Sequence, residues 1–240
     1  MVDTTPWPGL RLGAPLSGGA KSRVWAAELG GERVVVRHSR RSADSLAWEL
    51  DLMAELDGAG FVVPTVREAE DGRPSVDGVI VQSWIDGRPP SSASHWQAVA
   101  AELQRLHRLT EGHPQRPSCV TVPKLGARRR SVDADLDAIP DEVEARVVEV
   151  FTSFTDVGTG VVHGDPGPGN LRITEAGRVG FLDWDESRVD LVWHDLSDLG
   201  VQVLDDESHR RAQRLSDAWE AANAWIAEPE YARRRFARLD

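Results

Sequence analysis

The chain carries the sequence VVHGDPGPGN at residues 161–170 and the sequence FLDWD at residues 181–185. Asp165 follows an apolar run and lies in a loop that is too rich in glycine and proline to form a helix. Asn170 begins the next expected strand and Asp183 follows the strand after it, so a β-hairpin would bring both side chains back to the same end. Two carboxylates and an amide oxygen gathered in this way suit a hard cation such as Mg²⁺.

This pattern resembles the catalytic segment of the aminoglycoside phosphotransferase and choline kinase-like family of small-molecule kinases. The family signature HGD-x4-N is present as His163, Gly164, Asp165 and Asn170, and Asp183 follows thirteen residues later, where the family has its metal-binding aspartate. The resemblance implies that Asp165 is the catalytic base or orients the acceptor hydroxyl, and that Asn170 and Asp183 hold Mg²⁺. The alternative, an ordinary Asp-rich turn with a surface asparagine, accounts less well for the rest of the chain.

A glycine-containing loop at residues 16–24 lies between two β-rich runs. It resembles the family's loop over the nucleotide phosphates, although a plain glycine turn explains the pattern alone equally well. It is not a Walker A loop, because Gly-Lys-Ser/Thr is absent at the required spacing. In the first interpretation, backbone N–H groups and hydroxyls would contact the phosphates. The residues concerned are Ser17, Gly18, Gly19 and Ser22.

Arg37 ends the apolar run Val34–Val36, at the position where the family normally has a lysine that pairs with the nucleotide phosphates and a helix glutamate. Arginine binds phosphate and carboxylate through two parallel hydrogen bonds, so the charge is kept while the geometry changes. Glu49 lies beside the apolar stripe of an expected helix, where a lone carboxylate would be costly. We therefore expect Arg37 and Glu49 to form a functional ion pair. The alternative is a salt bridge at the rim, worth about 0–1 kcal/mol.

Residues 79–87, VIVQSWIDG, resemble the strand and hinge that join the two lobes of the family's fold. The resemblance is one of position, and it implies that backbone groups at Ser83 and Ile85 face the purine base of ATP or GTP. The sequence DGRPP at residues 86–90 then interrupts regular structure, and the character of the chain changes.

The helix expected over residues 95–109 ends in the family's Leu-x-x-Leu-His pattern. The resemblance implies that His107 is a buried support for the catalytic loop rather than a catalyst, and that His163 has a similar task. Two further acids follow in the sequence. Asp185 would reach the metal or the substrate, and Asp195 would either cap a helix or brace the catalytic loop.

The pattern along the chain changes from strand-rich to helical. Short β-rich runs with glycine turns occupy residues 10–37, and two more strands are expected near residues 65–69 and 78–84. We expect an α+β, two-lobed protein-kinase-like fold, with an antiparallel-sheet lobe at residues 1–86 and a mainly helical lobe at residues 87–240. Helices are expected at residues 43–57, 95–109 and 143–154, and from about residue 191 nearly to the end.

Composition excludes several classes of protein. Acidic residues outnumber basic ones, 39 to 28, which gives a net charge of −11 and argues against a nucleic-acid partner. No apolar run approaches the roughly 20 residues of a membrane span. The start of the chain lacks the features of a secretory signal. Cys119 is the single cysteine, so a disulfide framework and a Cys-rich zinc site are both excluded, and a cytoplasmic location is expected.

The leading hypothesis is a Mg²⁺-requiring kinase that transfers the γ-phosphate of ATP or GTP to a hydroxyl of a small molecule. The acceptor would be an aminoglycoside-like antibiotic, an amino alcohol or another hydroxylated metabolite. The acid-rich residues 133–144 would favour a cationic acceptor, although acidic runs are commonly solvated helix faces. A nucleotide-binding pseudokinase is the alternative, favoured by Arg37 in place of lysine. A protein kinase and a metal-dependent phosphohydrolase fit less well, and the sequence leaves the oligomeric state open.

Overall fold

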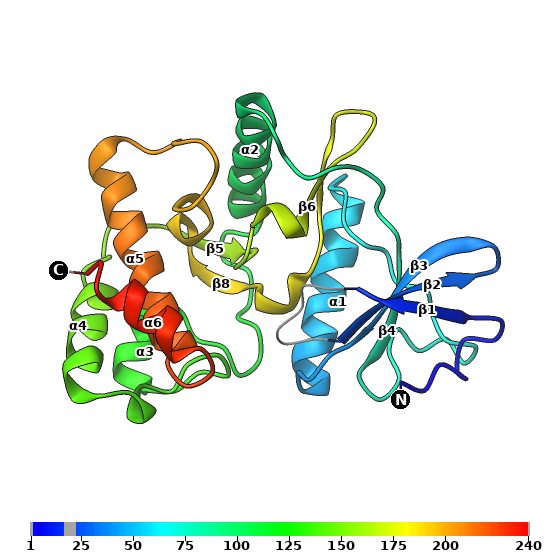
Figure 1. Ribbon diagram of the computed structural model, residues 1–240, viewed down its shortest axis with the longest axis horizontal. Coiled ribbons are helices and arrows are strands. Elements are labelled where there is room, and N and C mark those ends of the chain that lie inside the picture. The colour runs from blue at the N-terminus through cyan, green and yellow to red at the C-terminus, as the bar shows by residue number, and fades with distance from the viewer. Residues whose placement is uncertain (1, 17–22, 240) are drawn as a thin grey trace. The chain divides into compact units, whose positions relative to one another are not determined.

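The computed structural model describes residues 2–16 and 23–239, which form two compact units (Figure 1). The chain leaves the first unit at Pro90 and returns to it once. The sequence analysis instead divides the chain at residue 86 and assigns the returning segment to the C-terminal lobe. The first unit comprises Met1–Pro90 and Pro168–Asp185, and the second comprises Ser91–Gly167 and Glu186–Asp240.

A four-stranded antiparallel sheet forms the centre of the first unit, with its strands in sequence order. The valines of β3 alternate between its two faces, and Val36 pairs with Val81 of β4 in the buried part of the sheet. β-Branched side chains favour this extended, half-buried backbone. The strands are β1 (Arg11–Pro15), β2 (Arg23–Leu29), β3 (Glu32–His38) and β4 (Val79–Ser83).

The prediction of a strand near residues 65–69 is wrong. This segment makes only a single bridge to the sheet, between Val66 and Gln82. The chain then turns, and the N–H of Ala69 bonds to the carbonyl oxygen of Arg73 at 2.9 Å. The turn ends the pairing before a strand can form.

Helix α1 (Ala43–Gly58) begins where the sequence predicts, with Ser42 as its N-cap. The Ser42 hydroxyl accepts a hydrogen bond from the N–H of Ser45 at 3.3 Å, which satisfies one of the free donors of the first turn. The buried stripe of α1 includes Leu46, Leu50, Met53 and Leu56, and Glu49 lies on the same buried side. The helix lies beside the sheet in Figure 1.

The predicted hairpin is present as β6 (Leu171–Ile173) paired antiparallel with β7 (Val179–Phe181). Its two ends meet, because the N–H of Leu182 bonds to the carbonyl oxygen of Asn170 at 2.8 Å. Asp183 follows directly, so the hairpin brings the two expected metal ligands to one end.

Backbone bridges join this hairpin to the N-terminal segment of the first unit, residues 1–90. Gly180 pairs with Val62, and Ile173 pairs with Arg88. The latter pair exchanges two hydrogen bonds, of 3.1 and 2.7 Å. These bridges explain why the hairpin belongs to the first unit, although the residues directly before and after the hairpin in the sequence belong to the second unit.

The second unit is mainly helical, with a small sheet in which β5 pairs antiparallel with β8. Helices α3, α4, α5 and α6 pack in succession and bury side chains such as Phe151 and Trp219. Among the described residues, no helix is both long and apolar enough to cross a membrane. The elements are α2 (Ala93–Leu109), α3 (Val122–Arg128), η1 (Leu136–Ala138), α4 (Asp141–Thr152), β5 (Thr159–Val162), β8 (Arg188–Leu191), η4 (Val192–Leu196), α5 (Asp206–Ala224) and α6 (Pro229–Phe236).

Candidate functional site

The first unit contains a cavity of about 320 Å³, within the usual range for small-molecule sites. It is lined by the sheet, by α1 and by both ends of the β6–β7 hairpin. The cavity brings together six residues that the sequence analysis assigns to the nucleotide and metal sites. These are Arg37, Glu49, Ser83, Ile85, Asn170 and Asp183.

The expected phosphate loop borders this cavity at its two described ends. Leu16 and Val24 both line the cavity. The four residues predicted to contact the phosphates, namely Ser17, Gly18, Gly19 and Ser22, lie outside the residues that the structure describes. Their role therefore stays a prediction.

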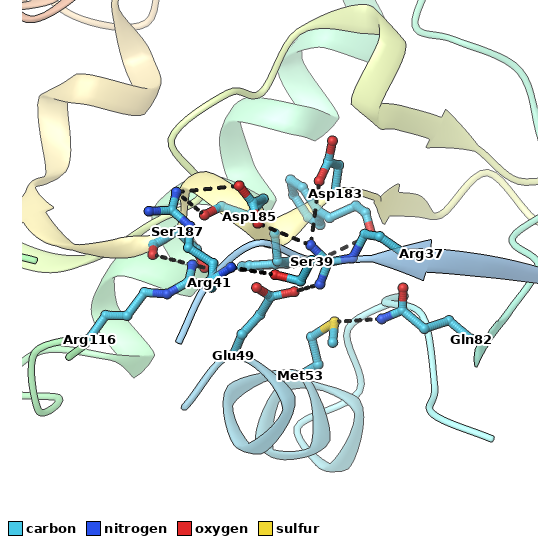
Figure 2. A network of polar contacts seen from close by, with 12 residues as sticks. Arg37, Ser39, Arg41, Glu49, Met53, Gln82, Arg116, Asp183, Asp185 and Ser187 are labelled. Atoms are coloured by element: carbon cyan, nitrogen blue, oxygen red, sulfur yellow. Dashed lines mark hydrogen bonds and ion pairs between the residues drawn. The ribbon is translucent and has the colours of Figure 1, made fainter. Parts of the chain in front are cut away.

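Arg37 of β3 and Glu49 of α1 form the predicted ion pair (Figure 2). Nη2 of Arg37 donates to Oε1 of Glu49, and the two residues are only 3% and 0% exposed. The pair is thus buried and not a salt bridge at the rim. Nη1 of Arg37 also lies 3.4 Å from Asp185 and 4.0 Å from Asp183. Burial acts to lower the pKa of Arg37, but the charges of Glu49, Asp183 and Asp185 raise it above its ordinary value.

Asp185 is tied to arginines of the first unit. Its Oδ2 lies 3.4 Å from Nη2 of Arg41, and its carbonyl oxygen accepts from the same nitrogen at 2.7 Å. Asp185 also pairs with Arg37. These contacts make Asp185 part of the network that orients the Arg37 guanidinium, rather than a side chain exposed to a substrate. The sequence analysis missed Arg41. The sequence feature that could have identified it is a positive charge directly before a helix N-terminus. The helix dipole disfavours a positive charge there unless an acidic group is near.

Asn170 and Asp183 offer an amide oxygen and a carboxylate to the cavity. Asp183 has a left-handed backbone with φ of +52°, which is uncommon for a residue other than glycine and is typical of functional turns. The donor set fits Mg²⁺, which prefers oxygen ligands and keeps positions for water and phosphate. Among the described residues, no group of three or more His, Cys, Asp or Glu side chains is arranged to hold a metal ion. Two protein ligands would therefore need water and phosphate oxygens to complete the coordination.

Asp165 lies in the second unit, on an exposed loop that follows β5. Asp195 braces this loop, because its carboxylate accepts from the backbone N–H groups of His163 and Gly164 at 2.8 and 2.9 Å. The sequence analysis left capping and bracing open, and the structure shows bracing. Gly164 has a φ of +91°, and a Cβ there would meet the carbonyl oxygen of Glu186 at 2.6 Å, so only glycine fits.

His107 supports the same brace, as predicted. Its Nε2 lies 2.9 Å from Oδ2 of Asp195, and both residues are buried. Burial acts to raise the pKa of Asp195, but the hydrogen bond from His107 and the electrostatic interactions with His107 and His163 lower it to about 2. Because an ionised carboxylate only accepts hydrogen bonds, His107 carries its proton on Nε2.

A second, smaller cavity, of about 100 Å³, borders Asp165 in the second unit. Its walls come from the loop 164–167, from η4 and the residues after it, and from α5. His194 of η4 is one of the lining residues and is 6% exposed. No pattern of spacing in the sequence singles out this histidine, and the sequence analysis missed it.

The acid-rich residues 133–144 line neither of these two cavities. Their carboxylates pair instead with the basic run directly before them. Asp135 lies 3.1 Å from Arg130, and Glu144 lies 2.7 Å from Arg129. This arrangement favours the interpretation of an internally paired surface segment.

Acid is expected to destabilise the protein through His194. Burial lowers the pKa of His194 to about 4, with a further contribution from Arg188 that Asp190, Asp195 and Asp198 oppose. Between pH 6.5 and about 4, His194 binds a proton in the unfolded chain but not in the folded chain. Its contribution to the free energy of unfolding is therefore fully present above pH 6.5 and is lost as the pH decreases toward 4. The expected loss is about 3 kcal/mol.

Urea unfolding at pH 7 and at pH 4.5 measures this loss. The variant His194→Phe is the control. Acidic groups elsewhere in the protein make the same contribution to the pH dependence of stability in the variant and in the wild type. The wild type should lose more stability than the variant on acidification. A difference between the two proteins that does not change with pH would contradict the assignment to His194.

Three solved structures similar to this chain are small-molecule kinases. Choline kinase LicA from Streptococcus pneumoniae is 14% identical, with a TM-score of 0.66 over 95% of this chain and 92% of that one. Aminoglycoside phosphotransferase APH(4)-Ia is 15% identical, with a TM-score of 0.68 over 98% and 93%. Amicoumacin kinase hAmiN is 19% identical, with a TM-score of 0.60 over 95% and 79%. At these identities the likeness confirms the predicted fold class.

No curated protein matches the chain. The sequence profile described as the phosphotransferase enzyme family matches residues 13–237, which is nearly the whole chain. This match agrees with the resemblance found at the HGD-x4-N signature. The chain therefore belongs to the phosphotransferase enzyme family.

Proposed function

We propose that this phosphotransferase is a small-molecule kinase that transfers the γ-phosphate of ATP or GTP to a hydroxyl of its acceptor. The observation that carries the proposal is the cavity of the first unit. It combines a buried Arg37–Glu49 ion pair with Asn170 and Asp183, which are the group types that a nucleoside triphosphate and its metal require.

On the donor side, Arg37 would supply a permanent positive charge beside the phosphates. Glu49 and Asp185 fix the orientation of the guanidinium, so that little side-chain entropy remains to be lost on binding. Asn170 and Asp183 would hold Mg²⁺, which when bound neutralises charge on the phosphate oxygens. Ser83 and Ile85 would meet the purine base through their backbone groups.

On the acceptor side, Asp165 would accept the hydrogen of the attacking hydroxyl. Its carboxylate is exposed, while the backbone before it is held by Asp195 and by the buried His107. A rigid loop that presents one exposed carboxylate suits a reaction that depends on positioning. Catalysis would then rest on orientation and on charge neutralisation more than on covalent chemistry.

The ligands of similar proteins support a nucleotide donor. The hAmiN structure is a complex with AMP-PNP, Ca²⁺ and Ami. A ternary complex of an APH(4)-Ia mutant holds AMP-PNP and hygromycin B. The acceptors named for these relatives are chemically different from one another, so they do not select one for this chain.

A phosphorylation screen tests the proposal. Purified protein is incubated with ATP or GTP, with and without Mg²⁺, against aminoglycosides, amino alcohols, nucleosides and sugars, and phosphorylated product is detected by mass spectrometry. The proposal requires a product that needs both the nucleotide and a divalent cation. A protein that binds neither nucleotide under any metal condition would instead support a non-catalytic fold.

The metal assignment makes a separate prediction. Mg²⁺ with ATP at a hundredfold excess over Kd should stabilise the wild type by about 2.7 kcal/mol. Asp183→Ala should abolish the Mg²⁺-dependent part of this gain, because it removes the only carboxylate of the proposed metal pair. Thermal unfolding with and without Mg²⁺ measures the effect.

Glu175→Ala is the matched control for Asp183→Ala. Glu175 is an exposed acid in the turn of the same hairpin, and it does not line the cavity. This control should respond to Mg²⁺ and ATP as the wild type does. A full Mg²⁺-dependent shift in Asp183→Ala would remove Asp183 from the metal site.

A further inference from the structure

Arg172 of β6 lines the cavity of the first unit and takes no part in the proposed metal and base contacts. Leu171, directly before it, is fully buried. Side chains alternate between the two faces of a strand, so Arg172 lies on the face of the hairpin opposite to Leu171. An arginine therefore stands in the wall of the cavity, where the neighbouring lining residue Leu182 is apolar.

The charges around the cavity single out Arg172. Four of the described lining residues are charged, namely Arg37, Glu49, Arg172 and Asp183. Arg37 pairs with Glu49 and also lies 3.4 Å from Asp185, so two carboxylates offset its charge. Asp183 is the proposed metal ligand. Among the described residues, Arg172 bonds to carbonyl oxygens and not to a carboxylate, so its positive charge remains available to an anion.

The guanidinium of Arg172 is anchored at one nitrogen and open at the others. Its Nη1 donates to the carbonyl oxygens of Gly169 and Leu171, at 3.0 and 2.7 Å. Among the described residues, its Nε and Nη2 have no hydrogen-bond acceptor, and neither nitrogen is closed to water. A ligand in the cavity can therefore reach donors whose position the backbone already fixes.

The side chain of Arg172 runs between the two ends of the proposed donor site. Its Cβ lies 3.1 Å from the place that a Cβ of Gly87 would take, two residues after Ile85 at the expected base end. Its guanidinium bonds to Gly169 and Leu171, the residues on either side of the expected metal ligand Asn170. In a nucleoside triphosphate, the ribose and the α-phosphate connect the base to the phosphates that a metal ion bridges.

We propose that Arg172 binds the α-phosphate of the donor nucleotide. The proposal rests on the proposed function and adds a binding site for one part of the donor. A guanidinium fits a phosphate because it donates two parallel hydrogen bonds, and Nε with Nη2 forms such a fork. A ribose hydroxyl is uncharged, so contact with the ribose alone would leave the positive charge of Arg172 without an anion.

Binding of AMP and of adenosine to Arg172→Met tests this proposal. The two probes differ only in the α-phosphate, and methionine keeps an unbranched side chain without the charge. Isothermal titration calorimetry in the absence of Mg²⁺ should show that the wild type binds AMP more tightly than adenosine. The variant should lose AMP affinity about tenfold, the value of one hydrogen bond to a charged group, and keep its adenosine affinity. GMP and guanosine are titrated in parallel, so the test applies to either purine.

Two further variants identify the cause of a loss. Arg172→Lys keeps the charge but replaces the planar fork by a point charge, so it should recover part of the AMP affinity. Arg178→Met is the matched control. Arg178 belongs to the same hairpin and also donates to a carbonyl oxygen, that of Gly60 at 2.5 Å, but it does not line the cavity. Its replacement should leave the AMP affinity unchanged.

Several outcomes would overturn the proposal. Equal losses of AMP and adenosine affinity would place Arg172 against the ribose or the base. An AMP affinity that Arg172→Met does not alter, or that Arg178→Met lowers equally, would remove the phosphate contact. A wild type that binds neither nucleoside monophosphate, or binds both no better than their nucleosides, would also exclude it. A lower melting temperature of Arg172→Met with unchanged AMP affinity would show a structural arginine only.

AMP also separates this proposal from the proposed function, because it has no γ-phosphate to transfer. A tenfold loss of AMP affinity in Arg172→Met supports the α-phosphate site even in a protein that phosphorylates nothing. An active kinase in which Arg172→Met leaves both the AMP affinity and the KM for its nucleotide unchanged keeps the proposed function and loses this site.

Discussion

Asp165→Asn is expected to lower kcat by about 10²- to 10⁴-fold, the usual value of general acid–base catalysis. An amide has nearly the shape of a carboxylate but cannot take up the hydroxyl proton. Nucleotide affinity should change little, because Asp165 acts on the acceptor. Steady-state kinetics with the acceptor found by the screen, together with a nucleotide titration, measure both quantities.

Asp156→Asn provides the control for this variant. Asp156 belongs to the same unit and pairs with Arg211 at the surface, at 2.7 Å, without lining the cavity that borders Asp165. Its replacement should leave kcat within about twofold of the wild type, since surface changes away from special features are typically small. Near-normal turnover by Asp165→Asn would show that the catalytic assignment is wrong.

Asp195→Ala is expected to lower the free energy of unfolding by about 3 kcal/mol or more, because each buried donor that loses its acceptor costs about 1–3 kcal/mol. The change leaves the ring N–H of His107 and the backbone N–H groups of His163 and Gly164 without their acceptor. Urea unfolding followed by tryptophan fluorescence measures the loss. The variant that still folds should also lose kcat, because the loop that carries Asp165 is no longer held.

Asp206→Ala serves as the comparison for Asp195→Ala. Asp206 is an exposed acid in the first turn of α5, and its replacement should change stability by less than about 1 kcal/mol. If the two variants were equally stable, the bracing role of Asp195 would be refuted.

The sequence reveals those parts of the site that local patterns encode. Glu49 is anomalous in an apolar helical stripe, and this anomaly predicts its buried cation correctly. The hairpin between Asn170 and Asp183 follows from strand periodicity and from a turn of the right length. Ser42 marks the start of α1, because a hydroxyl before an apolar helical pattern is a typical N-cap.

Elements with buried charge were missed for a physical reason. Strand β8 contains Arg188 and Asp190, whose side chains are fully buried and paired at 2.8 Å. Charged residues in a short segment of sequence suggest a surface loop. Only the three-dimensional structure shows that they are buried and paired with each other. Helix α3 contains Pro123 and Gly126, both poor helix formers, so its short pattern does not stand out.

Contacts between distant segments are also invisible to local patterns. Arg41 and Asp185 meet although 144 positions separate them. His194 has no neighbour in the sequence that marks it as buried beside Asp165. Tertiary packing alone determines these positions, whereas the family signature is visible in the sequence and predicts which groups react.

The return of the β6–β7 hairpin to the first unit affects the order in which the protein can fold during its synthesis. Ribosomes add about 5–20 residues per second, so on the order of 5–20 s pass between the appearance of Pro90 and that of Asp185. Until the hairpin appears, Val62 and Arg88 lack their backbone partners, and the cavity of the nascent first unit lacks the wall that the hairpin supplies. A chain truncated anywhere in this interval would lack the complete hairpin, so the first unit could not form all of its backbone pairs.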